Sequence, residues 1–539
     1  MAVETVRPEG YDRRWWILAV LCLSLLVIGL DNTVLNVALP TLVRELHASD
    51  SQLQWMIDAY TLVFAGLLLT TGSLSDRFGR RSALSAGLVV FGVGSVASAF
   101  AGSPEVLIAM RAVMGVGGAL IMPSTLSILT NVFPAEERGR AIGIWAGVSG
   151  LGIGVGPLVG GALLNHFWWG SVFFVNVPIV ILALVSGRLL VPDSKDPSAP
   201  KVDPIGVLLS VTGLVSLVYA IIEAPRHGWA DPVTVIGLAV GAVLVAAFVA
   251  WELHTDHPML NVRFFENPRF SAANVSITLV FFAMFGSLFF LTQYLQFILG
   301  YSPLEAGTRT APIALVILVV APISGALVHR IGNKALTAGG LLIVGLGLLV
   351  MSRTSLGSGY GHLLLSILIL GTGMSLAMTP ATESIMGSLP REKAGVGSAM
   401  NDTTRQIGGA LGVAVLGSIF SSAYASGLAT TLSRLPTEVA EVVRSSVGGA
   451  LLAAKTIGGP SGAALAGSAS TSFVHAMDRA LTIGALIAGA ASVVALLWLP
   501  NRAEPDVEEL HRMEEVYAGH HEGHGAAVPD GLDLGTVEG

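Results

Sequence analysis

Long apolar runs recur along the whole chain, and they constrain its fold more than any other feature of the sequence. A helix needs about 20 consecutive, mostly apolar residues to cross a lipid bilayer. The chain is 53% hydrophobic and only 12% charged, whereas a soluble domain carries about 25% charged residues. We therefore predict an all-α membrane protein rather than a series of soluble domains.

Fourteen runs are long enough to be interpreted as transmembrane helices. They cover residues 15–37, 52–73, 82–101, 105–130, 140–163, 171–190, 205–223, 233–252, 271–298, 305–328, 335–352, 361–386, 395–420 and 475–499. The first run is longer than the apolar core of a signal peptide, so we expect it to remain as an uncleaved helix.

Lysine and arginine are distributed unevenly between the predicted loops. An even number of spans places both termini on one side of the membrane, and most loop lysines and arginines fall on that side. Basic loops remain in the cytoplasm. The sequence thus predicts a multi-pass protein of the bacterial cytoplasmic (inner) membrane with both termini in the cytoplasm.

The charge and cysteine content exclude several other classes of protein. The net charge of −7 arises from an acidic tail, residues 501–539, and no basic patch indicates a nucleic-acid partner. The only cysteine is Cys22, so no disulfide can form within the chain. We interpret the histidines of the tail as part of a solvated, disordered segment, and we predict neither a metal site nor a cofactor.

A loop sequence occurs twice. Gly72-Ser-Leu-Ser-Asp76-Arg77-Phe-Gly79-Arg80-Arg81 returns 253 residues later as Gly325-Ala-Leu-Val-His-Arg-Ile-Gly332-Asn-Lys, both times after an even-numbered span. Such a repeat is typical of transporters built from two similar halves. It divides the chain into an N-terminal six-helix bundle (1–193), a two-helix insert (194–260), a C-terminal six-helix bundle (261–500) with an extracytoplasmic segment (421–473), and the tail (501–539).

Three motifs resemble those of one family. The loop at 72–81 resembles the signature loop of the major facilitator superfamily, and Leu30-Asp31-Asn-Thr-Val-Leu-Asn36-Val-Ala-Leu-Pro40 resembles the first-helix motif of its fourteen-span drug:proton antiporters. Residues 147–161 resemble the fifth-helix motif of exporters. The resemblance covers nearly all of residues 12–500 and implies the major facilitator fold, with two six-helix bundles plus two extra helices. Quaternary-ammonium and dye exporters are the most similar branch, because Asp31 and Asp58 occur together.

The signature loop and the fifth helix have separate implied roles. The resemblance implies that the loop residues Gly72, Asp76, Arg77, Gly79 and Arg80 latch the cytoplasmic side and release it during alternating access; a simple topogenic loop is the alternative for the arginines. On the fifth helix, the small residues lie four apart and form one smooth face for close packing, with a proline that can bend the helix. These residues are Gly152, Gly156, Pro157 and Gly160.

Charged residues inside membrane spans are costly and therefore indicate function. A carboxyl group at this depth can hold either a proton or a cationic substrate, which is the simplest form of antiport. The candidates for proton coupling or cation binding are Asp31, Asp58, Glu223 and Glu383. Arg111 joins them because Arg111-Ala-Val-Met114-Gly115-Val-Gly117 resembles the proton-coupling motif of the family, with methionine where glutamine is usual.

Aromatic and polar side chains predict a substrate cavity. Several lie on one approximate face of the ninth span, where they could bind flat lipophilic cations through cation–π contacts or simply face lipid. The candidate cavity residues are Asn36, Trp55, Phe282, Phe285, Phe289, Gln293, Gln296, Met374 and Met378.

These features predict a proton-coupled multidrug efflux transporter, acting as a monomer on lipophilic, cationic compounds. A dedicated proton-coupled exporter of a single antibiotic or metabolite is the alternative. The sequence shows no nucleophile constellation, metal-ligand cluster or phosphate-binding loop, so we do not predict an enzyme.

Overall fold

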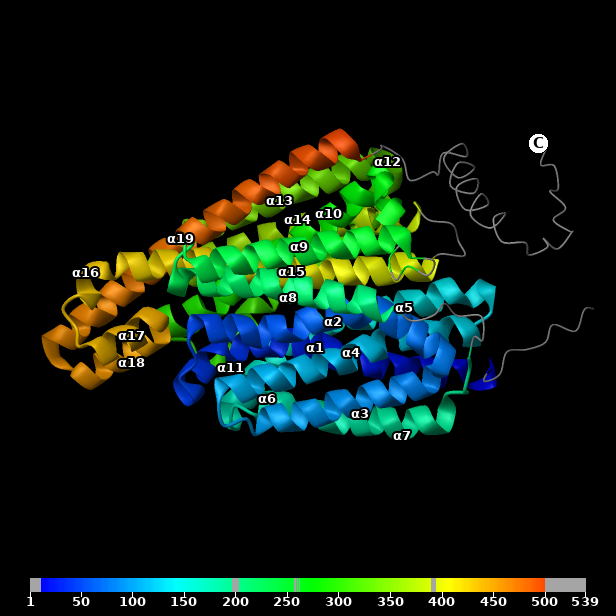
Figure 1. Cartoon of the computed structure of the whole chain (residues 1–539), viewed down its shortest axis with the longest axis horizontal. Coiled ribbons are helices and arrows are strands. Elements are labelled where there is room, and N and C mark those ends of the chain that lie inside the picture. Colours follow the sequence, from blue (N-terminus) through cyan, green and yellow to red (C-terminus); the bar gives the residue numbers. More distant parts are fainter. Residues whose placement is uncertain are drawn as a thin grey trace, which may run out of the picture.

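The computed structural model describes residues 11–195, 203–255, 258, 260, 262–388 and 394–499. Within these ranges every regular element is a helix. The long helices run roughly parallel to the long axis of the molecule, with the N-terminal helices in the lower part of Figure 1 and the C-terminal helices in the upper part. We call the end where α1 begins the terminal end and the opposite end the distal end.

The N-terminal helices pack mainly against one another, α1 on α5 and α2 and α3 on α4. They are α1 (Arg14–Leu46), α2 (Asp50–Phe78), α3 (Arg80–Ala99), α4 (Pro104–Val132), α5 (Ala135–His166), α6 (Ser171–Phe174) and α7 (Asn176–Leu190). Short polar residues cap several helix starts: the Ser49 hydroxyl accepts from the Gln52 amide at the start of α2. Such caps satisfy amide groups that have no partner within the helix.

Two helices lie between the halves, α8 (Pro204–His227) and α9 (Pro232–His254). α8 packs against both α2 and α15, whereas α9 packs chiefly on α8. The hairpin therefore covers the seam between α2 and α15, and it crosses the front of the bundle in Figure 1.

The C-terminal part is longer and more interrupted. It comprises α10 (Pro268–Gln293), α11 (Pro303–Thr310), α12 (Pro312–Ile331), α13 (Asn333–Ser352), α14 (Tyr360–Met386), α15 (Ala394–Gly427), α16 (Ala429–Leu432), α17 (Thr437–Ser445), α18 (Val447–Ile457) and α19 (Gly459–Trp498), with the 3-10 helix η2 (Val262–Glu266) before α10 and a π-helical turn, η3 (Tyr294–Ile298), after it. α16 to α18 protrude at the distal end (Figure 1).

Two helices extend well beyond the predicted spans. α15 continues to Gly427 and α19 already begins at Gly459, whereas the apolar runs suggested helices at 395–420 and 475–499. An apolar run marks only the part of a helix that crosses lipid, but helical hydrogen bonding continues as long as packing supports it. Only α16, α17 and α18 occupy the remainder of the segment predicted to lie outside the bundle.

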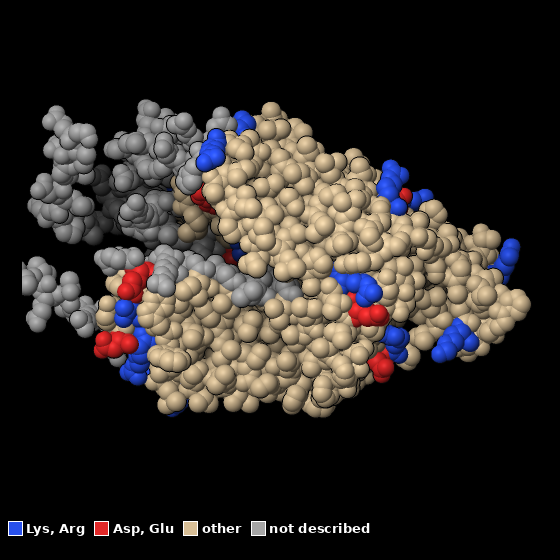
Figure 2. Space-filling model, turned by 180° about the vertical axis from the view of Figure 1, so that it is seen from behind, with Lys and Arg blue, Asp and Glu red and all other residues tan. Residues whose placement is uncertain are grey.

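Twelve helices in the described ranges are long and apolar enough to cross a membrane. They match twelve of the fourteen predicted spans; α2 and α5, with 29 and 32 residues, are the two long helices outside this set. The count of fourteen therefore stays a prediction. On the face seen in Figure 2, charged side chains gather toward the two ends and leave a broad belt of other residues between them, as expected for a lipid-facing surface.

The repeated loop has the same backbone geometry in both copies. Gly79 joins α2 to α3 with φ 116°, and Gly332 joins α12 to α13 with φ 89°. Both values lie where only glycine is comfortable. Further along, Gly87 packs against the Gly117 carbonyl of α4 and Gly340 against the Gly373 carbonyl of α14. The helix pairs that follow the two loops thus approach each other through equivalent glycines.

The halves contact each other chiefly along three seams, α2 with α15, α5 with α11, and α1 with α10. Close contacts lie in the distal parts of these helices: the Gln296 amide donates to the Val37 carbonyl at 2.8 Å, and Gly161 lies against Pro303.

Candidate functional site

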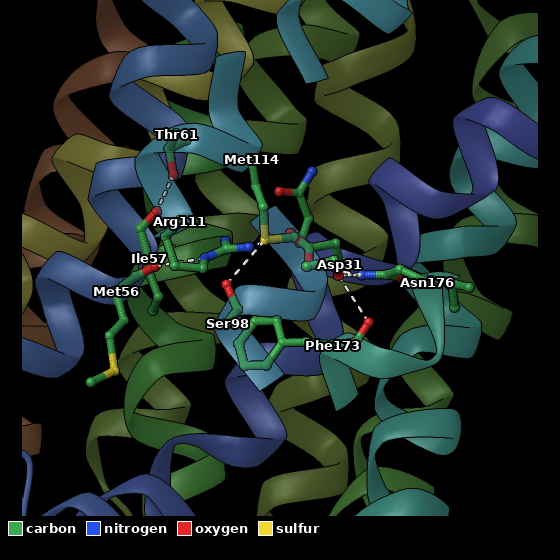
Figure 3. Close-up of polar contacts among 12 residues, drawn as sticks. Asp31, Met56, Ile57, Thr61, Ser98, Arg111, Met114, Phe173 and Asn176 are labelled. Atoms are coloured by element: carbon green, nitrogen blue, oxygen red, sulfur yellow. Dashed lines mark hydrogen bonds and ion pairs between the residues drawn. The ribbon is translucent and has the colours of Figure 1, made fainter. Parts of the chain in front are cut away.

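A buried ion pair lies inside the N-terminal half, near the middle of α1 (Figure 3). Asp31 of α1 and Arg111 of α4 are 0% and 1% exposed, and an Arg111 guanidinium nitrogen donates to Asp31 Oδ2. The sequence predicted both residues as functional but not their contact. Because each would be costly to bury alone, the pair explains how two charged side chains are tolerated in the apolar interior.

The second helix fixes the guanidinium. Arg111 Nε donates to the Met56 carbonyl at 2.9 Å, and the guanidinium carbon lies 4.4 Å from the centre of the Tyr60 ring. A cation over an aromatic face gains electrostatic stabilisation. Arg111 is therefore held in place by α2 as well as by Asp31.

Asn176 and Ser95 complete the site, and the sequence analysis missed both. The Asn176 amide reaches Asp31 Oδ1 at 3.4 Å and Ser95 Oγ at 3.0 Å, while Ser95 donates to the Phe173 carbonyl at 2.8 Å. Asn176 lies at the junction of α6 and α7, as a single amide in an apolar run. A single polar residue in an apolar run is the sequence feature that could have indicated a functional role for Asn176.

Met114, which departs from the family's usual glutamine, lies in the same region. Its sulfur accepts a hydrogen bond from Ser98 Oγ at 3.5 Å, and its side chain packs against Gly94 of α3. Methionine thus fills the α3–α4 contact here and does not bind the Asp31 carboxylate.

The remaining predicted carboxylates do not join this site. Asp58 is completely buried, and neither of its oxygens has a hydrogen-bond partner. Glu223 accepts a hydrogen bond from Ser51 Oγ at 2.7 Å, which ties α8 to the start of α2. Glu383 is half-buried in the last turn of α14, far along the bundle from the middle of α1.

The signature loop packs on the segment that follows α7. The Arg80 amide donates to the Ser194 carbonyl at 3.0 Å. Gly79 packs so closely against the Asp193 carboxylate that a side chain at this position would crowd it. Arg81 lies 3.6 Å from the Asp193 carboxylate. Gly72 is half-buried on α2 and Arg77 is exposed; the Asp76 side chain lies outside the described residues, so its predicted role remains a prediction.

The small face of α5 packs against α1. Gly152 lies on Gly29, Gly156 on the Thr33 hydroxyl, and Gly160 on Val34. On its other side, α5 meets the C-terminal half, where the Pro157 carbonyl contacts Gly307 of α11. The predicted packing face thus connects the helix that carries Asp31 with a seam between the halves.

The structure places the predicted cavity residues in several different environments. Trp55 packs against Tyr219 of α8, and Met374 belongs to the hydrophobic core, with Met378 packed against it. Phe282 and Phe285 lie against the glycines Gly412 and Gly409 of α15.

Three amides lie near the α1–α10 seam. Asn36 and Gln293 donate only to carbonyls of their own helices, and their amide oxygens have no partner; Gln296 crosses to α1. Phe289 is fully buried beside Phe290. Lining of a substrate cavity remains a prediction for all of these residues.

Comparison with known proteins identifies the class. Residues 21–413 match the model of the Major Facilitator Superfamily. A tetracenomycin C resistance and export protein of Streptomyces glaucescens is 34% identical over 501 residues, covering 92% of this chain and 93% of the relative. The multidrug efflux pump LfrA of Mycolicibacterium smegmatis is 36% identical over 483 residues, covering 89% and 95%.

Solved structures show the same fold. A bacterial homologue of the human lysosomal transporter Spinster has a TM-score of 0.65 at 20% identity, covering 90% of this chain and 98% of that one. The peptide transporter POT has a TM-score of 0.59 at 17% identity, covering 92% and 96%.

The chain belongs to the Major Facilitator Superfamily. It is a multi-span helical membrane transporter whose relatives are named as drug-efflux and antibiotic-resistance proteins. The predicted fold class is confirmed.

Proposed function

We propose that the protein exports lipophilic, cationic compounds in exchange for protons, with Asp31 as the coupling carboxylate. The buried Asp31–Arg111 pair carries this proposal. In an apolar interior the carboxylate is stable either as the partner of a cation or in its neutral, protonated form. A proton and a cation therefore compete for one group.

The surroundings of the pair support a switch rather than a purely structural bridge. Arg111 also donates to the Met56 carbonyl and lies over the Tyr60 ring, and neither contact involves Asp31. Asn176 can still bind a protonated Asp31 through its unpartnered carbonyl oxygen. Both protonation states of Asp31 thus find polar partners at the same position.

Transport would follow from movement at the seams. Asp31 lies on α1, and α1 packs through glycine contacts on α5, which in turn contacts α11 of the C-terminal half. A change in the charge at Asp31 can therefore alter how the two halves pack. We assign the terminal end to the cytoplasm because of the basic loops there.

Cysteine labelling tests this orientation. In a Cys22→Ser background, a membrane-impermeant thiol reagent should label Thr437→Cys at the exposed start of α17 in intact cells. Lys195→Cys, exposed after α7, should be labelled only after the cells are opened. The reverse pattern would place the termini outside.

The function is tested by ethidium movement in proteoliposomes under an imposed pH gradient. We expect gradient-driven transport by the wild type and its loss in Asp31→Asn. Asp231→Asn is the matched control, because Asp231 caps α9 through the Val233 amide at 2.9 Å and asparagine caps equally well.

Three results would separate the alternatives. If Asp31→Asn still couples transport to the gradient, Asp31 is not the coupling group and Asp58 becomes the next candidate. If a panel of lipophilic cations shows no driven flux, the multidrug proposal fails. Gradient-driven transport of a single antibiotic in the same assay would then show that the protein is a dedicated exporter. The name of the tetracenomycin relative suggests this activity.

A further inference from the structure

A row of polar side chains on α2 faces α15 at the seam between the halves. Asp50, Gln54 and Asp58 lie four residues apart and so share one face of the helix. They are 3%, 0% and 0% exposed. Met56 and Tyr60, which hold Arg111, lie on the other side of α2, so this row is separate from the Asp31 site.

Polar groups on α15 oppose this row. Tyr424 lies two turns from Gly417 on α15, the helix that packs along α2. Gln54 fits beside Gly417, where an added Cβ would come within 2.8 Å of its amide. Ser421 lies between Gly417 and Tyr424 on the same face of α15, one turn from each.

None of these groups has all its hydrogen bonds. Atoms buried without a partner are Asp50 Oδ1, both amide atoms of Gln54, both carboxylate oxygens of Asp58, Ser421 Oγ and the Tyr424 hydroxyl. An unsatisfied buried polar atom costs about 1–3 kcal/mol. Several of them along one narrow seam indicate bound water, which makes about three hydrogen bonds at such sites.

Apolar side chains close the end of the row that lies beyond Asp58. The next turn of α2 after Asp58 brings Leu62, which packs in an apolar cluster with Val218 and Ile222 of α8 and Ala410 and Ala414 of α15. The opposite end reaches Asp50, the first residue of α2 at the distal end. Water could therefore enter from the distal surface and would stop at Asp58.

We propose that the α2–α15 seam binds a file of water molecules that connects the distal surface with Asp58 and carries protons to it. Asp50 lies about 12 Å from Asp58 along the helix, at 1.5 Å per residue, a gap that roughly four waters at hydrogen-bond spacing would fill. Gln54, Ser421 and Tyr424 hold the file in place.

Proton movement along this file is balanced at each step. A hydronium ion at the distal mouth gives one proton to the first water, which passes another of its own protons onward, and the last water protonates an Asp58 oxygen. Each new O–H bond replaces one that breaks. The net result is one proton removed from the distal solution and one neutral Asp58. Besides Asp50, one other carboxylate lies near the distal mouth of the file: Glu223, which accepts a hydrogen bond from Ser51.

The water is tested without any transport measurement, by hydroxyl-radical footprinting of the full chain in lipid nanodiscs. Radicals form from bound water and oxidise tyrosines beside it. Tyr424 and Tyr294 are both 0% exposed, but the Tyr294 hydroxyl is bonded to the Ser355 carbonyl at 2.7 Å. We expect Tyr424 to be modified faster. Equal rates for the two tyrosines would overturn the proposal.

The proton step rests on the proposed exchange for protons, with Asp58 as a second carboxylate that is protonated besides Asp31, and it is tested in proteoliposomes. Gln54→Leu should slow gradient-driven ethidium transport about tenfold, as when one hydrogen-bonded link is lost. Thr61→Val is the matched control, since the Thr61 hydroxyl is already bonded to the Ile57 carbonyl at 2.7 Å. If Gln54→Leu does not fold, Tyr424→Phe removes only one hydroxyl.

The two proposals fail in different ways. If the wild type shows no gradient-driven transport, the proposed function fails, and the footprinting result still decides whether water occupies the seam. If the pH gradient drives ethidium transport by the wild type, and Gln54→Leu and Tyr424→Phe transport ethidium at the same rate, the file carries no protons and this inference is wrong.

Discussion

A double-mutant cycle on Asp31 and Arg111 tests the central claim about the site. Asp31→Asn leaves a guanidinium that is 1% exposed with only the Met56 carbonyl and the Tyr60 ring as partners. Removing one member of a buried pair costs about 3–5 kcal/mol. Arg111→Gln leaves a carboxylate with a single amide partner at 3.4 Å, and we expect a cost in the same range.

The double variant should be destabilised much less than the sum of the two single variants. It contains two neutral amides of similar size, and neither leaves a buried charge unpaired. Close charge pairs show coupling energies of about 1.5 kcal/mol or more, and we expect about 2–3 kcal/mol here, within the usual range for residues in contact.

The measurement is unfolding in mixed micelles with increasing SDS, followed by tryptophan fluorescence; the chain has 9 tryptophans. The control is the same cycle on Arg309 and Glu305, a partly exposed pair at 3.8 Å, where coupling should be below about 1 kcal/mol. Free-energy changes for Asp31 and Arg111 that add within about 0.5 kcal/mol would refute a direct, desolvated ion pair.

Two further predictions concern glycines whose replacement tests close packing and backbone strain. In Gly156→Ala the added methyl group would overlap the Thr33 hydroxyl, so the apparent unfolding temperature should fall by an amount corresponding to about 1–3 kcal/mol. Gly187→Ala is its control, because the nearest atom to that methyl is 3.8 Å away, and an equal loss in both would contradict the packing of α5 on α1. Gly79→Ala forces a φ of 116° on alanine and should cost about 1–3 kcal/mol, measured by the same thermal unfolding. Gly102→Ala meets no atom within 4 Å; if it destabilises the protein as much, strain at Gly79 is not the cause.

The sequence alone determined the membrane class and the fold. Apolar runs longer than 20 residues permit little besides membrane helices, and the duplicated loop around Gly79 and Gly332 indicated two similar halves. Asp31 and Arg111 could also be singled out, because a charged residue inside an apolar run is costly wherever the helices finally pack.

Only the tertiary structure decided which polar residues meet. Asp31, Arg111 and Asn176 lie on three helices, and no spacing within one helix predicts contacts between helices. The same holds for Asp58, whose oxygens have no hydrogen-bond partner and take no part in the ion pair. The position of α8 across that seam likewise depends on how complementary surfaces such as Gly66 and Val211 fit together. Local sequence sets the length and polarity of each helix, whereas the packing of side chains from distant segments sets the helix faces that touch.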